Sequence, residues 1–126
     1  MKQLFVPYEQ SLELRELGFD EICLTHYWGN DILNEAYGGW MKNSNTKYVM
    51  SPTWEQTFKW FREKHNLHSE ILLDRTTYPK YSFEIHRYED FGNYEKIENQ
   101  DWSLYRTFEE AQLTCLNEII KLVKTK

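Results

Sequence analysis

The 126-residue chain has few of the residues that cross-link small folds or interrupt their helices and strands: it contains two cysteines, three prolines and five glycines. Cys23 and Cys115 lie far apart and match no metal-ligand or redox spacing, so we expect both to be reduced and buried. No stretch has the length of uncharged apolar chain that a membrane span needs, and charge appears too early for a signal peptide. We therefore expect a cytoplasmic protein with a single domain, residues 1–126.

Positive charge is in deficit as well. The chain has 15 Lys and Arg against 20 Asp and Glu, a net charge of −5. A negative domain repels the phosphate backbone, so nucleic acid is not an expected partner. The sequence also lacks zinc-finger spacing, a Gly-rich phosphate loop and the G-x-S-x-G nucleophile motif. We accordingly predict no catalytic residue, no metal site and no cofactor.

Aromatic residues, in contrast, are abundant. They make up 17% of the chain, as seven Phe, nine Tyr and five Trp. This number exceeds what a core of this size requires beside its Leu, Ile and Val residues. Some of the rings are therefore expected at the surface, although a Trp or Tyr often completes a small core by burying its ring and leaving its polar tip in water.

The first half of the chain predicts one helix and two strands. Pro7 opens a helix over residues 7–17, which Gly18 ends. Residues 21–28 have β-branched and aromatic types that alternate as in a strand, and a return strand is predicted over residues 33–37. The polar segment 38–47 is predicted to be a mobile loop.

The second half predicts two helices and up to four strands. Ser51 as cap and Pro52 as first helical residue begin a helix that ends at Asn66. Residues 69–75 and 81–88 form the strongest predicted hairpin, with Phe83 and Ile85 inward and Glu84 and His86 outward. The remaining elements are weaker strands over 94–98 and 102–106, and a final helix over 107–124 that begins with a capping box.

Together these elements predict an α+β fold. Its expected architecture is a small antiparallel sheet covered on one face by two or three helices, in the order α-β-β-α-β-β-(β)-α. The final helix has a wide apolar face, so we expect it to pack on the sheet and on another helix.

Three stretches carry a resemblance to a known group of proteins. They are LRELGFDEIC near the start, SPTWEQTFKWFREKHNL in the middle and TFEEAQLTCLNEIIKLV at the end. Together they cover about half of the chain and resemble a family of small uncharacterised proteins from bacteriophages and integrated mobile elements of gut-type bacteria. The resemblance implies that the protein acts inside a cell that carries such an element, where short accessory proteins commonly bind host components.

Several polar pairs invite a chemical interpretation, and each has a simpler one. His65 and His68 have the spacing of metal ligands, but the helix is predicted to end between them. Glu84 and His86 share a strand face and could form an acid–base pair, although such alternation also describes an ordinary solvated face. Cys23 with His26 could be a nucleophile pair, but on a strand the two point to opposite faces.

The aromatic residues around the predicted loop are the more promising feature. Trp54, Phe58 and Phe61 form one stripe of their helix, which leaves Trp60 off that stripe and facing outward. We predict that the partner- or ligand-binding residues are Trp28, Tyr37, Trp40, Lys42 and Trp60. Such a surface suits a protein partner or the stacking of a planar ligand.

Three functions remain open at this point. The first is a non-enzymatic accessory protein that binds a host protein through the aromatic-rich surface. The alternative is a protein that binds or sequesters a small nucleotide-like signal, with loop 38–47 and Lys42 contacting its phosphate. The third is an enzyme that uses Glu84 and His86. Homo-oligomer formation through the aromatic surface would resemble either kind of binding patch.

Overall fold

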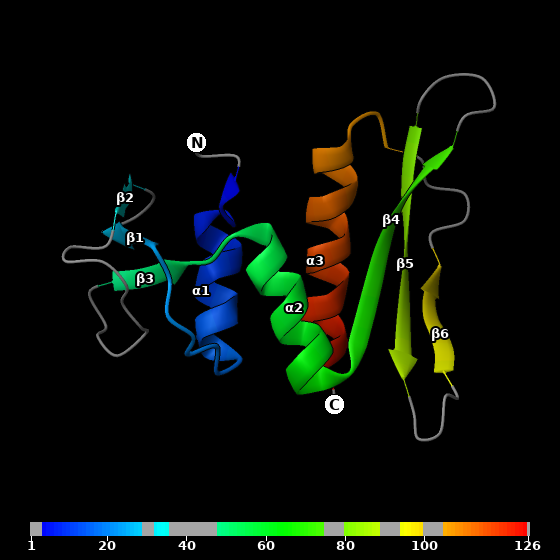
Figure 1. Cartoon of the computed structure of the whole chain (residues 1–126), viewed down its shortest axis with the longest axis horizontal. Helices are drawn as coiled ribbons and strands as arrows, with labels where there is room; N and C mark the ends of the chain where they lie inside the picture. Colours follow the sequence, from blue (N-terminus) through cyan, green and yellow to red (C-terminus); the bar gives the residue numbers. More distant parts are fainter. Residues whose placement is uncertain are drawn as a thin grey trace. The chain divides into compact units, whose positions relative to one another are not determined.

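A computed structural model describes residues 4–28, 32–35, 48–74, 80–88, 94–99 and 105–125. Within these described residues, three helices and six strands follow one another (Figure 1). They are α1 (Tyr8–Glu16), β1 (Thr25–Trp28), β2 (Ile32–Glu35), β3 (Tyr48–Ser51), α2 (Trp54–His65), β4 (Leu67–Asp74), β5 (Lys80–Tyr88), β6 (Tyr94–Asn99) and α3 (Phe108–Lys124). The α+β class is confirmed.

The strands form two antiparallel sheets where the sequence predicted one. The first has the order β2-β1-β3 and the second the order β4-β5-β6. The chain divides into two compact units, Met1–Trp60 and Phe61–Lys126, with the division inside α2. Strand β3 was not expected, because its first residues follow the segment interpreted as a loop. That loop, residues 38–47, lies outside the described residues.

In the first unit, α1 ends as the sequence predicted. Gly18 has a φ of 97°, a conformation that costs glycine little. The Gly18 amide donates to the Arg15 carbonyl at 3.1 Å, and the Phe19 amide donates to the Leu14 carbonyl at 3.0 Å. This pair of bonds is a Schellman motif, and it directs Phe19 into the core, where it is 1% exposed.

The Val6 carbonyl joins α1, β1 and β3 in the core of the first unit. It accepts hydrogen bonds from the hydroxyls of Ser11 at 3.1 Å, Tyr27 at 3.0 Å and Ser51 at 2.8 Å. Buried hydroxyls need such partners, because an unsatisfied one would destabilise the fold. Ser51 therefore has a different role from the predicted helix cap.

Thr53 provides the helix cap that was assigned to Ser51. Its hydroxyl accepts a hydrogen bond from the Gln56 amide at 3.1 Å, and α2 begins at Trp54. The helix ends before Asn66, whose φ of 55° is the left-handed conformation expected of a terminating Asn.

In the second unit, α3 packs against β4 and β5 and runs alongside them in Figure 1. The apolar face of α3 meets the inner side of the sheet, where Phe83 and Ile85 are buried as predicted. Thr107 caps α3 by accepting a hydrogen bond from the Glu110 amide at 3.1 Å. Because Phe83 and Ile85 of β5 face inward, the alternate residues Glu84 and His86 lie on the outer face of the sheet.

None of the helices among the described residues combines the length and apolar character that a bilayer crossing requires.

Candidate functional site on the outer face of the second sheet

Trp60 does not face outward as predicted. It is 3% exposed, and its ring lies edge-on against Phe19 with 5.4 Å between the centroids. The buried residues of α2 in fact include Thr57, Trp60 and Phe61. Trp54 and Phe58 are only partly buried and stack on each other at 6.2 Å. The core-facing stripe is thus rotated from the predicted one, and Trp60 belongs to it.

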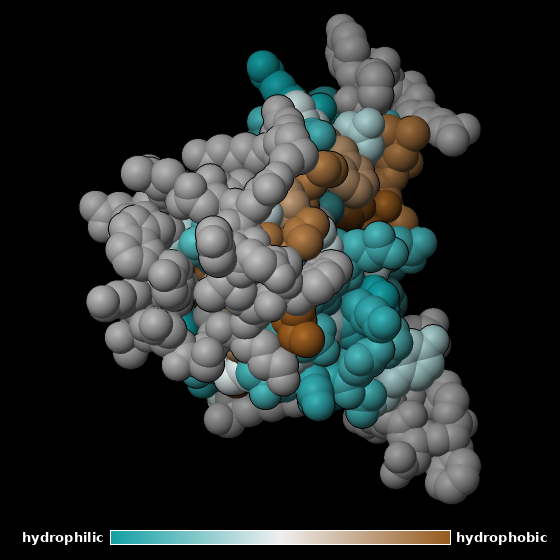
Figure 2. All heavy atoms as spheres, turned by 60° about the vertical axis from the view of Figure 1, so that its left-hand side comes forward, coloured by the Kyte–Doolittle hydropathy of each residue, from teal (hydrophilic) through white to brown (hydrophobic). Residues whose placement is uncertain are grey.

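The structure does not bring together the other predicted aromatic residues. Tyr37, Trp40 and Lys42 lie outside the described residues. Trp28 ends β1 and is paired through its backbone with Ile32 and Tyr48, and its side chain is likewise not described. Hydrophobic side chains do reach the surface on the face drawn in Figure 2, beside a larger hydrophilic area. The predicted aromatic surface itself stays a prediction.

The cysteines are buried, in agreement with the sequence. Burial raises the pKa of Cys23 to about 12, with a smaller contribution from the Glu21 carboxylate. Burial also raises the pKa of Cys115 to about 12, although a hydrogen bond with Ser69 acts in the opposite direction. Thiols with such pKa values contain almost no thiolate at neutral pH. His26 is also buried, and its pKa is lowered by desolvation. Cys23 and His26 are therefore poorly suited to nucleophilic catalysis.

His65 and His68 belong to different elements, as the predicted helix end implied. The ring of His65 lies near that of Phe61, with 5.8 Å between the centroids. His68 is the second residue of β4, and its ring lies edge-on to Tyr88 at 4.5 Å. Among the described residues, no three His, Cys, Asp or Glu side chains lie together as a metal site would require.

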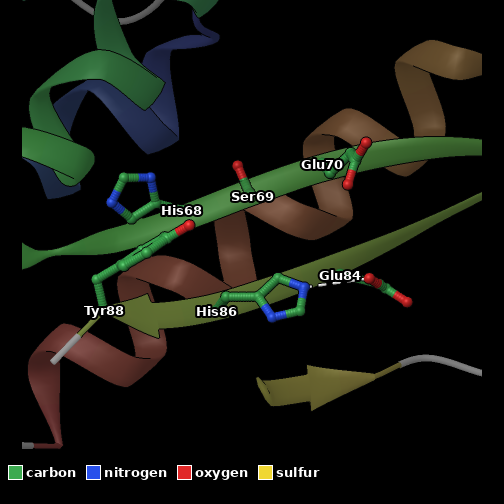
Figure 3. Close-up of a pocket in the computed structure, with 6 residues that line it drawn as sticks. All are labelled: His68, Ser69, Glu70, Glu84, His86 and Tyr88. Carbon is green, nitrogen blue, oxygen red and sulfur yellow. Dashed lines mark hydrogen bonds and ion pairs between the residues drawn. The ribbon is translucent and has the colours of Figure 1, made fainter. Parts of the chain in front are cut away.

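The most notable site is a hollow on the outer face of the β4-β5-β6 sheet, shown in Figure 3. It has a volume of about 600 Å³ and is open to solvent. We call it the outer-face hollow, and its lining residues are His68, Ser69, Glu70, Glu84, His86 and Tyr88.

Strand register produces the arrangement of the hollow. β4 and β5 are antiparallel, with His68 opposite His86 and Glu70 opposite Glu84. Because alternate residues of a strand share a face, these four side chains and Tyr88 lie on the same side of the sheet. The hollow therefore has an acidic row, a histidine row beside it and an aromatic ring at one end.

Two contacts organise the side chains, and both are visible in Figure 3. His86 Nε2 lies 3.1 Å from Glu84 Oε2, and the two side chains are 20% and 25% exposed. At the other end, His68 packs against Tyr88, which is 44% exposed. The pKa of His68 is lowered, first by desolvation and then by the charges of Arg62 and His86.

A histidine paired with a carboxylate can hold or move a proton, and two carboxylates beside a ring can bind a cation. Proton transfer alone is a small part of catalysis, which also requires a positioned nucleophile or a site that excludes water. The hollow is open to solvent, and Cys23 and Cys115, whose pKa values burial raises, are not among the residues that line it. The charged side chains of the hollow are also able to contact a charged group of a ligand.

The sequence identified Glu84 and His86 as neighbours on an outward face but missed His68, Glu70 and Tyr88 as their companions. His68 was assigned to a loop because the strand was predicted to begin at residue 69 rather than at Leu67. The apolar Leu67 and Ile71, on the face opposite the polar His68 and Glu70, are the signal that would have extended the strand.

Comparisons with protein-family models, with curated proteins and with solved structures found no match to the chain. The resemblance to phage and mobile-element proteins therefore stays a prediction.

Proposed function

We propose that this chain is a non-enzymatic binding protein and that the outer-face hollow receives a basic segment of a protein partner. The resemblance to phage and mobile-element proteins favours a host protein as that partner, met in the cytoplasm. The single observation that carries the proposal is that two carboxylates, Glu70 and Glu84, lie on the same open sheet face as the Tyr88 ring, against which His68 packs.

The acidic row favours a cation. Glu70 is exposed, and Glu84 lies directly opposite it on the neighbouring strand. The 3.1 Å contact between His86 Nε2 and Glu84 Oε2 holds the Glu84 carboxylate at one place on the sheet. An arriving Lys or Arg would find two acceptors on neighbouring strands, one of them already positioned, which lowers the ordering cost of binding.

The aromatic end favours an extended segment rather than a small ion. Glu84 and Tyr88 are four residues apart on β5, which corresponds to about 13 Å along a strand. Tyr88 exposes almost half of its side chain and is supported by His68. A peptide with a basic residue and an apolar residue spaced along it would contact both ends of the hollow.

The same charges disfavour a phosphate-bearing ligand in this hollow, because Glu70 and Glu84 would repel it. The nucleotide-like ligand remains an alternative for another surface, the one predicted from Trp28, Tyr37, Trp40 and Lys42.

The proposal is tested with a capped peptide of alternating Lys and Val residues and a second peptide with Glu in place of Lys. We expect the full chain to bind only the first. Removing the negative charge of either carboxylate, in Glu70→Gln or Glu84→Gln, should weaken binding roughly three- to tenfold. Glu16→Gln is the matched control, because it removes an exposed charge from α1. Equal affinities for all three variants would show that attraction to the net charge explains binding and would refute the proposal.

A further inference from the structure

The second unit has one long edge strand. β4 spans eight residues and lies at the end of the β4-β5-β6 order, so the described residues place a strand on only one of its sides. An edge strand presents a row of backbone donors and acceptors, and proteins usually protect such a row from pairing with another chain.

The alternation of hydrogen bonds between β4 and β5 shows which backbone groups of β4 form the unpaired row. The Tyr88 amide donates to the Asn66 carbonyl at 3.1 Å, and in an antiparallel pair such bonded positions alternate. The backbone groups that point away from β5 are therefore those of Leu67, Ser69, Ile71 and Leu73. Tyr81 of β5 supports this alternation. It lies opposite Leu73, but its backbone exchanges two hydrogen bonds with that of Tyr105, at 2.8 and 2.7 Å, on the side of β5 away from β4.

Three of the usual protections of an edge strand are absent from β4 itself. Its sequence, LHSEILLD, contains neither proline nor lysine, and its register with β5 runs without a bulge. Leu73 is 44% exposed, and Ile71 and Leu72 are only partly buried. Within the described residues, no backbone hydrogen bond reaches the outward groups of Ser69, Ile71 or Leu73. The strand is thus suited to accept another strand.

We propose that β4 pairs antiparallel with β4 of a second copy of this chain, about a two-fold axis at Ile71. In this register residues 68–74 of each copy pair, with His68 opposite Asp74, Glu70 opposite Leu72 and Ser69 opposite Leu73. No two like charges lie opposite each other, and the exposed Leu73 gains a neighbour.

The neighbouring registers are less favourable. An axis at Glu70 would place the two Glu70 carboxylates opposite each other, and an axis at Leu72 would place Glu70 opposite Asp74. Like charges directly opposite destabilise a strand pair. An axis at Ser69 avoids this repulsion but pairs fewer residues of the strand. Charge and length together select the axis at Ile71.

Pairing would join the β4-β5-β6 sheet of one copy and that of the second copy into one continuous sheet. The outer-face hollow then continues across the seam, because His68 and Glu70 lie on β4 and Asp74 of the second copy lies opposite His68. The proposal does not depend on the ligand of the hollow, since it follows from the alternation of backbone hydrogen bonds and the charges of β4.

Two substitutions at one position test the register. In the proposed pair, Leu72→Glu places two new carboxylates opposite the two Glu70 residues, whereas Leu72→Lys places two ammonium groups there. Both variants remove the same apolar side chain from the solvent-facing side of the sheet, so each is the folding control for the other. We expect the dimer of Leu72→Lys to dissociate at a roughly tenfold lower concentration than that of Leu72→Glu, by analytical ultracentrifugation. Equal dissociation constants of the two variants, or a protein that stays monomeric at all concentrations, would overturn the proposal.

Hydrogen exchange of the full chain provides the second measurement. The amides of Ser69, Ile71 and Leu73 should become protected as the concentration rises, while those of His68, Glu70 and Leu72 are protected throughout by their bonds to β5. A dimer that leaves the first three amides exchanging rapidly would use another surface and would overturn the proposal. Protection of these amides only when the Lys-Val peptide is added would assign the edge to a peptide and exclude the second copy.

Discussion

Replacing Trp60 with alanine should destabilise the first unit, although the sequence assigned this ring to a binding surface. Trp60 is 3% exposed and lies edge-on to Phe19 at 5.4 Å. Truncation of a buried aromatic side chain to alanine costs about 3–5 kcal/mol, because it removes apolar burial and leaves a cavity. That loss is a large part of the roughly 5–15 kcal/mol that stabilises a typical domain.

The assay is urea unfolding of the full chain, followed by circular dichroism. Trp54→Ala is the matched control, because Trp54 lies on the same helix and is only partly buried. We expect Trp60→Ala to lower the free energy of unfolding clearly more than Trp54→Ala does. A double-mutant cycle with Phe19→Leu should give a coupling of about 0.5–1.5 kcal/mol for the ring pair.

A loss below about 1 kcal/mol for Trp60→Ala would refute this reasoning, because surface substitutions fall in that range. The same result would return Trp60 to the candidate binding residues.

Two further predictions follow from buried titratable groups. Burial raises the pKa of Cys23 and Cys115 to about 12, so iodoacetamide should modify neither thiol at neutral pH until the chain unfolds; rapid modification of the native protein would contradict the burial. Burial lowers the pKa of His26 from 6.5, so below that pH the unfolded chain binds a proton that the native chain does not. The free energy of unfolding should therefore fall as the pH falls from 6.5 towards the lowered native pKa of His26, by at most about 1.4 kcal/mol per pH unit, and His26→Gln should reduce this slope in urea titrations. An unchanged slope in that variant would assign the effect to other groups.

Local rules predicted the parts of the fold that depend on neighbouring residues. The glycine after α1, the Thr107 cap of α3 and the left-handed Asn66 each follow from backbone chemistry within a few residues. The alternation of β5 likewise identified Glu84 and His86 as outward residues. In these cases the tertiary structure agrees with the local preference.

The errors arose where distant segments decide the outcome. The predicted and the observed stripe of α2 share Phe61, and the observed stripe contains Trp60, whose ring packs against Phe19 from a distant segment. Ser51 satisfies the rule for a cap, but its hydroxyl bonds to the Val6 carbonyl from 45 residues away. His68 joined the candidate site only through its register with His86. None of these choices is determined by the residues next to the one in question.

The most direct test of the proposed binding surface is an NMR titration of the isotope-labelled full chain with the Lys-Val peptide. The account predicts saturable chemical-shift changes that centre on Glu70, Glu84 and Tyr88, and that the Glu-Val peptide does not produce. Changes confined to residues outside the outer-face hollow would contradict it.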